Sequence, residues 1–171
     1  VSERNELIEA INSIEPNVVS IVDTFGAMDM IDLREIFRQF DKSLNSSIAI
    51  GLHSHDNLGL SCALAEYMVE LSCDTDRDVV VDGSLFGMGR GAGNAKTEII
   101  ANYINKHVEN KYNIEVLIDT IEKYIEPLMT DISWGYNLPM FICGSKHAHV
   151  DNVYYLNNSG SFSIKSSTRY L

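Results

Sequence analysis

Two histidines, His53 and His55, have the residue type and spacing expected of metal ligands. They directly follow residues 48–52, a short apolar run with the composition of a buried strand. Residues i and i+2 of a strand point to the same face, so both imidazoles would leave the strand end side by side. Imidazole nitrogen is a common ligand of divalent metals. The pair therefore predicts part of a metal site, although a bare His-x-His is also found in ordinary polar strand ends.

Two other predicted strands also end in polar residues. Residues 18–22 form a β-branched run that ends at Asp23 and Thr24, and residues 78–82 end in Asp82 before a glycine. In α/β folds the functional groups collect at the carboxyl ends of parallel strands. Three polar strand ends at one rim favour a functional role for the histidine pair. They also make Asp23 and Thr24 candidate substrate-binding residues.

The third strand leads into a glycine-rich loop, residues 87–94, with the sequence Gly-Met-Gly-Arg-Gly-Ala-Gly-Asn. The loop formally matches a dinucleotide fingerprint, but Glu109, at the distance where the ribose-binding acid should stand, falls at a predicted helix end. Two interpretations stay open beside this nucleotide one. The glycines could serve only the backbone dihedrals of the loop. Alternatively, Gly89, Gly91 and Asn94 could approach a small anionic substrate or a metal.

Helical periodicity separates the three strands and continues after the third. This alternation indicates parallel βαβ units with right-handed crossovers. Because each strand is apolar throughout, both faces of the sheet are expected to be covered. The helices are predicted at residues 2–14, 28–44, 60–71, 99–104, 114–128 and 137–148.

The composition excludes several classes of protein. The chain of 171 residues has a net charge of −11, which disfavours nucleic acid and anionic membranes as partners. It has no apolar run of about 18 residues and no signal-peptide pattern. Cys62, Cys73 and Cys143 are spaced for neither a disulfide nor zinc. These features predict a cytoplasmic protein.

Two further motifs have mainly structural interpretations. Trp134 and Tyr136 flank a glycine after a long helix, and they would pack the later helices on the main body unless the Tyr136 hydroxyl enters the site. His147 and His149 form a second His-x-His, but at the end of a predicted helix, where i and i+2 do not share a face. We expect this second pair to be structural or exposed.

Two motifs in the chain resemble a known family. Residues 50–59, Ile-Gly-Leu-His-Ser-His-Asp-Asn-Leu-Gly, followed by residues 84–94, are similar to the HMGL-like DRE-TIM metallolyases. The resemblance covers roughly residues 1–140. It is greatest to the 4-hydroxy-2-oxovalerate aldolase branch, whose members carry a similar glycine-rich loop and a later Gly-Tyr.

The resemblance implies an α/β fold, the C-terminal portion of a TIM (β/α)8 barrel. The three strands would be strands 6–8, followed by extra C-terminal helices. The expected organisation is a partial catalytic barrel at residues 1–110, a helical extension at 111–150 and a poorly ordered tail at 151–171. The resemblance assigns His53, His55 and Asn94 to the metal and Tyr136 to catalysis.

The implied reaction is divalent-metal-dependent cleavage or formation of a C–C bond next to a 2-oxo acid, from a 4-hydroxy-2-oxo acid to pyruvate and an aldehyde. Mn²⁺ or Mg²⁺ is expected, with Zn²⁺ possible. The family's Asp-Arg-Glu motif, which supplies a further metal ligand, has no counterpart here, and a full barrel needs ~250 residues. We therefore expect an incomplete portion of a longer enzyme.

Two alternatives remain. One is a Claisen-type acyltransferase or lyase that uses an acyl-CoA, although the CoA lyase branch has a cysteine in the loop where residues 87–94 have none. The other is a non-catalytic module that binds a partner. In either case the C-terminal helices could dock a partner dehydrogenase or a second copy of the chain.

Overall fold

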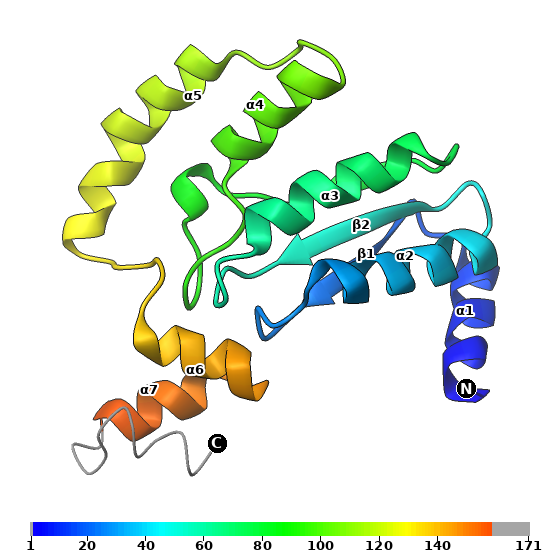
Figure 1. Ribbon diagram of the computed structural model, residues 1–171, viewed down its shortest axis with the longest axis horizontal. Helices are drawn as coiled ribbons and strands as arrows, with labels where there is room; N and C mark the ends of the chain where they lie inside the picture. Colours follow the sequence, from blue (N-terminus) through cyan, green and yellow to red (C-terminus); the bar gives the residue numbers. More distant parts are fainter. Residues whose placement is uncertain (1, 159–171) are drawn as a thin grey trace.

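The computed structural model describes residues 2–158, in which three parallel strands alternate with helices (Figure 1). The strand order is β1-β2-β3, with Val22 opposite His53 and Gly51 opposite Val80. The βαβ alternation predicted from the sequence is therefore confirmed. The elements of this part are α1 (Ser2–Ile14), β1 (Val18–Asp23), α2 (Met30–Ser43), β2 (Ala49–Ser54), α3 (Ser61–Cys73) and β3 (Val79–Val81).

Helices α2 and α3 cover one face of the sheet and build the main core there. Helix α2 begins at a capping box, in which the Asp29 carboxylate accepts hydrogen bonds from the backbone amides of Ile31 and Asp32. Its apolar stripe then meets β2, whose inward side chains are fully buried. The largest buried side chains of this core are Leu33, Phe37, Ile48, Ile50, Leu52, Leu64 and Met68.

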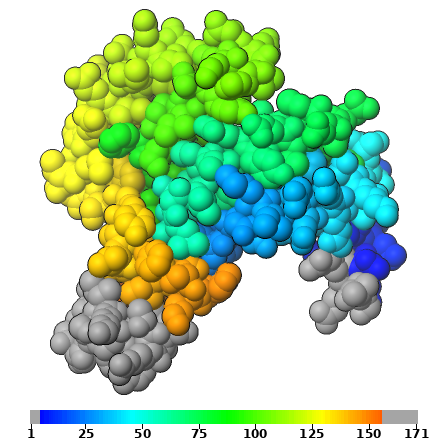
Figure 2. Space-filling view, viewed as in Figure 1, coloured from blue at the N-terminus to red at the C-terminus, as the bar shows by residue number. Residues whose placement is uncertain are grey.

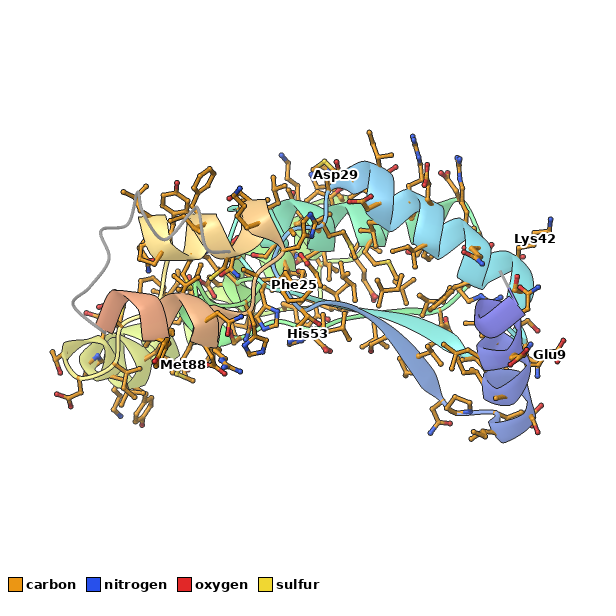
Figure 3. All side chains as sticks on the ribbon, turned by 90° about the horizontal axis from the view of Figure 1, so that it is seen from below. Glu9, Phe25, Asp29, Lys42, His53 and Met88 are labelled. Atoms are coloured by element: carbon orange, nitrogen blue, oxygen red, sulfur yellow. The ribbon has the colours of Figure 1, made fainter. Side chains whose placement is uncertain are left out.

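The opposite face of the sheet is open within the described residues. Val22 and Val80 are 53% and 39% exposed, and His53 belongs to this face through its register with Val22. Figure 3 shows His53 on the side of the sheet away from Asp29 and α2. The expectation that both faces are covered is thus wrong for this part of the chain. Apolar strand residues indicate that a face tends to be buried, but they do not determine which segment packs on it.

After β3 the chain continues through short and irregular helices. The helix predicted at residues 114–128 is divided into a short α-helix, a π-helical turn and a 3₁₀ segment that contains Pro127. The elements are η1 (Leu85–Gly87), α4 (Thr97–His107), α5 (Ile114–Thr120), η2 (Ile121–Ile125), η3 (Glu126–Thr130), α6 (Leu138–Lys146) and α7 (Val150–Asn158).

Helices α6 and α7 fold back onto the loops at the carboxyl end of the sheet. In Figure 2 the orange α6 lies directly against the blue and turquoise body. A Cβ on Gly144 of α6 would come within 2.7 Å of Leu58 Cγ and 3.0 Å of the Gly26 carbonyl oxygen, so the backbones are in close contact. A second apolar cluster joins these helices to the glycine-rich loop through Ala92, Met140, Cys143, Val150 and Val153.

Helix α7 extends into the segment that was predicted to be a tail. Residues 151–158, expected in a poorly ordered tail, lie in α7, where Val153 is fully buried. The remainder of that tail, residues 159–171, lies outside the described residues. Among residues 2–158 no helix is both long and apolar enough to cross a membrane.

Candidate functional site

The two histidines of the first motif lie together at the carboxyl end of β2. His53 is in the strand and His55 follows it, and their ring centroids are 5.0 Å apart with planes at 87°. The backbone of His55 pairs with that of Asn94 in an isolated antiparallel bridge. The structure thus brings together the three residues predicted as metal ligands.

An oxygen atom lies beside the Nδ1 atom of each histidine. His55 Nδ1 is 2.9 Å from the carbonyl oxygen of Asp23, and His53 Nδ1 is 3.3 Å from Asp82 Oδ2. A carbonyl oxygen only accepts, so His55 donates from Nδ1 and keeps its Nε2 lone pair. The Asp82 carboxylate favours the same tautomer for His53. Histidines that ligate metals usually have such an acceptor on the second nitrogen.

Asn94 has a buried oxygen that lacks a hydrogen-bond partner. Its Nδ2 group donates to the Met88 carbonyl at 3.2 Å and to Ser84 Oγ at 3.5 Å, whereas Oδ1 is buried and unpaired among the described residues. Leaving such an acceptor unpaired costs about 1–3 kcal/mol. A bound cation would compensate for this cost.

The donor set fits a divalent metal ion. Two imidazole nitrogens and an amide oxygen are ligands that Mn²⁺ and Zn²⁺ accept, and Mg²⁺ accepts the oxygen more readily than the nitrogens. Within residues 2–158 no group of three or more His, Cys, Asp or Glu side chains could hold an ion. The candidate set of His53, His55 and Asn94 therefore contains no carboxylate from the described residues.

The glycine-rich loop folds tightly upon itself. Gly93 has φ +92°, and a Cβ there would lie 2.1 Å from the Gly87 carbonyl oxygen, which accepts from the Asn94 amide. A Cβ on Gly89 would lie 2.6 Å from Asn94 Nδ2. The glycines thus permit the loop conformation and the approach to Asn94. Substrate binding by Gly89 and Gly91 stays a prediction.

The polar end of β1 has two different environments. The buried Asp23 carboxylate accepts from the backbone amides of Ala27 at 2.9 Å and Met28 at 3.3 Å, so it holds the turn after the strand. Thr24 is exposed and lines a small pocket beside His55. Their role in substrate binding stays a prediction.

Trp134 and Tyr136 are positioned by the segment before α6. Trp134 donates from Nε1 to the Phe86 carbonyl at 2.9 Å and so connects this segment to the loop after β3. Tyr136 is 62% exposed. Its predicted catalytic role is not tested by this arrangement.

The residue after His55 anchors the site to two neighbouring elements. Asp56 Oδ2 lies 2.9 Å from Lys96 Nζ, and Asp56 Oδ1 accepts from the backbone and hydroxyl of Ser61 at the start of α3. Burial lowers the pKa of Lys96, but the hydrogen bond and charge of Asp56 outweigh this effect and raise it.

Three residues near the site were missed by the sequence analysis. Asn57 is buried and connects two loops, because it donates to the Phe25 carbonyl and accepts from the Ala92 amide. Arg90 and His149 line the same small pocket as His55. Its place two residues after His55 was the only signal for Asn57, and no local pattern connects Arg90 to His149.

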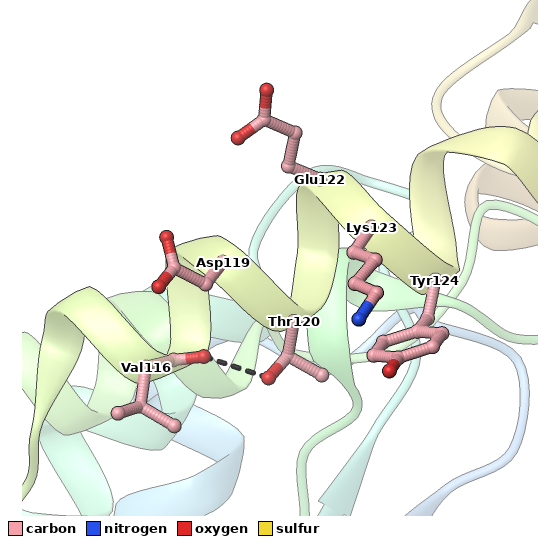
Figure 4. A pocket seen from close by; sticks show the side chains of 6 residues that line it. All are labelled: Val116, Asp119, Thr120, Glu122, Lys123 and Tyr124. Atoms are coloured by element: carbon pink, nitrogen blue, oxygen red, sulfur yellow. Dashed lines mark hydrogen bonds between the residues drawn. The ribbon is translucent and has the colours of Figure 1, made fainter.

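A larger hollow lies on α5 and η2, separate from the strand ends (Figure 4). It is an open hollow of about 630 Å³ lined by Val116, Asp119, Thr120, Glu122, Lys123 and Tyr124. Thr120 Oγ1 donates to the Val116 carbonyl, and Lys123 Nζ lies 4.9 Å from the centroid of the Tyr124 ring. The hollow is a feature of the helical surface and is not part of the histidine site.

Together the parallel sheet and the paired histidines at its rim define an α/β protein with a candidate metal site. The family model described as HMGL-like matches residues 2–123, and the chain belongs to this family. This confirms the resemblance inferred from the two sequence motifs.

Curated relatives at moderate identity share one name. A 4-hydroxy-2-oxovalerate aldolase of Thermomicrobium roseum is 35% identical over 130 residues, which are 75% of this chain and 34% of the relative. The protein of the same name from Chloroflexus aggregans is 33% identical over 125 residues, 72% of this chain and 34% of the relative. The chain thus spans about a third of the length of the curated relatives it matches.

Solved structures share the fold. The N-terminal domain of a candidate aldolase from Bacteroides vulgatus superposes with a TM-score of 0.79 at 30% identity, covering 95% of this chain and 50% of that one. The carboxyl transferase domain of Rhizobium etli pyruvate carboxylase, solved with pyruvate, has a TM-score of 0.65 at 13% identity, covering 99% and 28%. The latter likeness concerns the fold alone.

Proposed function

We propose that this chain carries the metal-binding part of a lyase that breaks or forms a C–C bond next to a 2-oxo acid. The proposed reaction converts a 4-hydroxy-2-oxo acid to pyruvate and an aldehyde. The observation that carries the proposal is the set of three ligand atoms: two Nε2 atoms left available by Asp23 and Asp82, and the unpaired Asn94 Oδ1. The name shared by the curated relatives supports the reaction class.

The chain's own residues fix the ligands before an ion arrives. Asp82 and the Asp23 carbonyl hold the two rings in one tautomer, and Gly89 leaves space for the Asn94 amide. A bound Mn²⁺ or Mg²⁺ would supply Lewis-acid polarisation of the 2-oxo acid. Tyr136 is proposed to border the substrate, and Asp23, Thr24, Gly89 and Gly91 to line it.

We further propose that the three strands correspond to strands 6–8 of a TIM barrel. The open sheet face, with Val22 and Val80 exposed, supports this proposal, because the corresponding face of a barrel strand packs into the interior. The remaining carboxylate ligand and the base for the hydroxyl proton would then come from residues outside those described. Unpaired Cys62, Cys73 and Cys143 support a reducing compartment such as the cytoplasm.

The exposed apolar residues of the C-terminal helices favour a second candidate function, the docking of a partner dehydrogenase or a second copy. Val116 and Ile118 of α5 are 56% and 54% exposed. Light scattering of the protein before and after Val116→Ser and Ile118→Ser would measure this association. An unchanged mass would contradict docking through α5.

The main test is a metal-dependent assay of the parent protein. With Mn²⁺ present, we expect release of pyruvate from 4-hydroxy-2-oxopentanoate and no release of free thiol from an acyl-CoA. His53→Ala should remove the pyruvate signal, whereas His107→Ala, at the end of α4, should retain it. Metal-dependent pyruvate release at wild-type rate by His53→Ala would refute the assignment.

A further inference from the structure

A small pocket of about 80 Å³ lies beside His55, on the side where α7 meets the rim of the sheet. The β1–α2 loop, the glycine-rich loop and the start of α7 all contribute to its walls. Its lining residues are Thr24, His55, Asn57, Arg90, His149 and Val150.

The pocket places an arginine and a histidine next to a predicted metal ligand. Arg90 Nη2 is hydrogen-bonded to Asp151 Oδ1, and His149 Nδ1 lies 3.4 Å from Asp151 Oδ2. Asp151 thus holds both side chains at the pocket. The contact raises the pKa of Arg90 and lowers that of Asp151, so the pair stays charged.

The Arg90 guanidinium has N–H donors that the contact with Asp151 does not use. Arginine carries five N–H donors in a planar fork, and among the described residues only Nη2 of Arg90 has a hydrogen-bond partner. The side chain is 55% exposed, so the other donors can reach a ligand. Because the protein has a net charge of −11, its overall field repels anions, and recognition of an anion requires local donors such as these.

The remaining lining residues set the size and polarity of the ligand. The side-chain amide of Asn57 already donates to the Phe25 carbonyl and accepts from the Ala92 backbone amide. The exposed Thr24 has a hydroxyl that can donate to a ligand. Val150 supplies an apolar wall. A volume of about 80 Å³ accommodates a carboxylate with one or two carbon atoms, but not a large group.

We propose that this pocket binds a carboxylate at the aldehyde end of the substrate, with Arg90 and His149 as specificity-determining residues. The substrate class is then a 4-hydroxy-2-oxo acid with a second, terminal carboxylate. This inference rests on the proposed lyase function. The family match ends at residue 123, so one wall of the pocket, His149 and Val150, comes from a segment outside the match.

The catalytic experiment compares two acceptor aldehydes in the addition of pyruvate. With Mn²⁺, kcat/KM is measured for succinic semialdehyde, which carries a carboxylate, and for butanal, which does not. Arg90→Gln should lower the ratio of the two values about tenfold to a hundredfold, as expected for a lost charge-assisted pair. Arg38→Gln, an exposed arginine on α2, is the matched control and should leave the ratio unchanged.

A binding experiment tests the pocket independently of catalysis. Succinate titrated into the metal-free, ¹⁵N-labelled chain should give saturable shifts of the Arg90 side-chain Nε–H and the Thr24 amide, and succinamide should not. Equal shifts with both compounds, or none with succinate, would overturn the inference. If succinate binds but no aldehyde reacts, the lyase proposal fails and the pocket stands; if both aldehydes react with an unchanged ratio in Arg90→Gln, only the pocket fails.

Asp151→Asn separates ligand binding from a purely structural tie between α7 and the loop. Asparagine removes the charge that competes for Arg90, so succinate should bind more tightly to this variant, while Arg90→Gln should lose binding. If both variants weaken succinate binding to the same extent, the Arg90–Asp151 contact only holds α7 in place, and the specificity role is wrong.

Discussion

His53 and Asp82 connect the carboxyl ends of two adjacent strands, with Nδ1 of the imidazole 3.3 Å from Oδ2 of the carboxylate. The backbone amide of Asp82 donates to the Leu52 carbonyl, so the sheet itself sets the register of this contact. The carboxylate orients the ring and favours the tautomer whose Nε2 can bind a metal.

Removing this acceptor should weaken metal binding while preserving the fold. We expect Asp82→Ala to lower Mn²⁺ affinity about 10- to 100-fold, because the ring loses its orienting partner. Calorimetric titration with Mn²⁺ measures the change. Asp78→Ala deletes the same charge just before β3, at its other end, and should have little effect; equal losses in both variants would indicate a general charge effect instead.

Asn94→Ala should lower the affinity for Mn²⁺ but hardly change the free energy of unfolding. The variant loses a ligand and the bond to Met88, but it also removes the unpaired Oδ1. The free energy of unfolding without metal should therefore stay within about 1 kcal/mol, because the two effects offset each other. Urea unfolding and Mn²⁺ titration check this; reduced stability with unchanged affinity would contradict the ligand role.

Arg77 is a buried polar anchor at the end of the sheet opposite the site. Its buried guanidinium bonds Asp41 Oδ1 and the carbonyl oxygens of Asn45 and Ile48. Arg77→Met should lower the free energy of unfolding by about 3 kcal/mol, since several acceptors lose their donor at once. Exposed Arg38→Met should change it by less than about 0.5 kcal/mol in the same urea experiment.

Gly144→Ala should weaken the attachment of α6. The new Cβ would meet Leu58 at 2.7 Å and the Gly26 carbonyl oxygen at 3.0 Å, and the carbonyl cannot move aside as a side chain can. Overpacking of this kind costs about 1–3 kcal/mol. Ser145→Ala, at an exposed position of the same helix, is the control. A Gly144→Ala protein as stable as the wild type would show that α6 moves freely on the body.

Cysteine labelling should report the packing of α6. Burial raises the pKa of Cys143 to about 11 from its ordinary value of 9.0, so the thiol stays protonated in the folded state at pH 8. Iodoacetamide should modify exposed Cys73 first and Cys143 only on unfolding. Because the folded pKa is the higher one, this contribution to stability is complete below pH 9 and is lost as the pH rises from 9 to 11. Equal labelling rates at pH 8 would show that Cys143 is accessible.

Patterns between near neighbours in the sequence were enough to predict the strands, most of the helices and the position of the histidine pair. Apolar runs and helical periodicity located β1, β2, β3 and the helices between them within a few residues. A two-residue spacing places His53 and His55 on one face in any strand, whatever surrounds it. The division of residues 114–130 was not predicted, because the π-helical turn at residues 121–125 follows no simple periodicity.

The sequence by itself determined that parallel strands end in two adjacent imidazoles and a glycine-rich loop with Asn94, because strand geometry and glycine dihedrals act between near neighbours in the chain. Only the tertiary structure decided that Asp82 and the Asp23 carbonyl hold the rings, and that Arg90 lines one pocket with His149, which follows it 59 positions later in the chain. Those contacts depend on sheet register and on the packing of α6 and α7 against the rim, which arise from long-range burial and not from any local pattern.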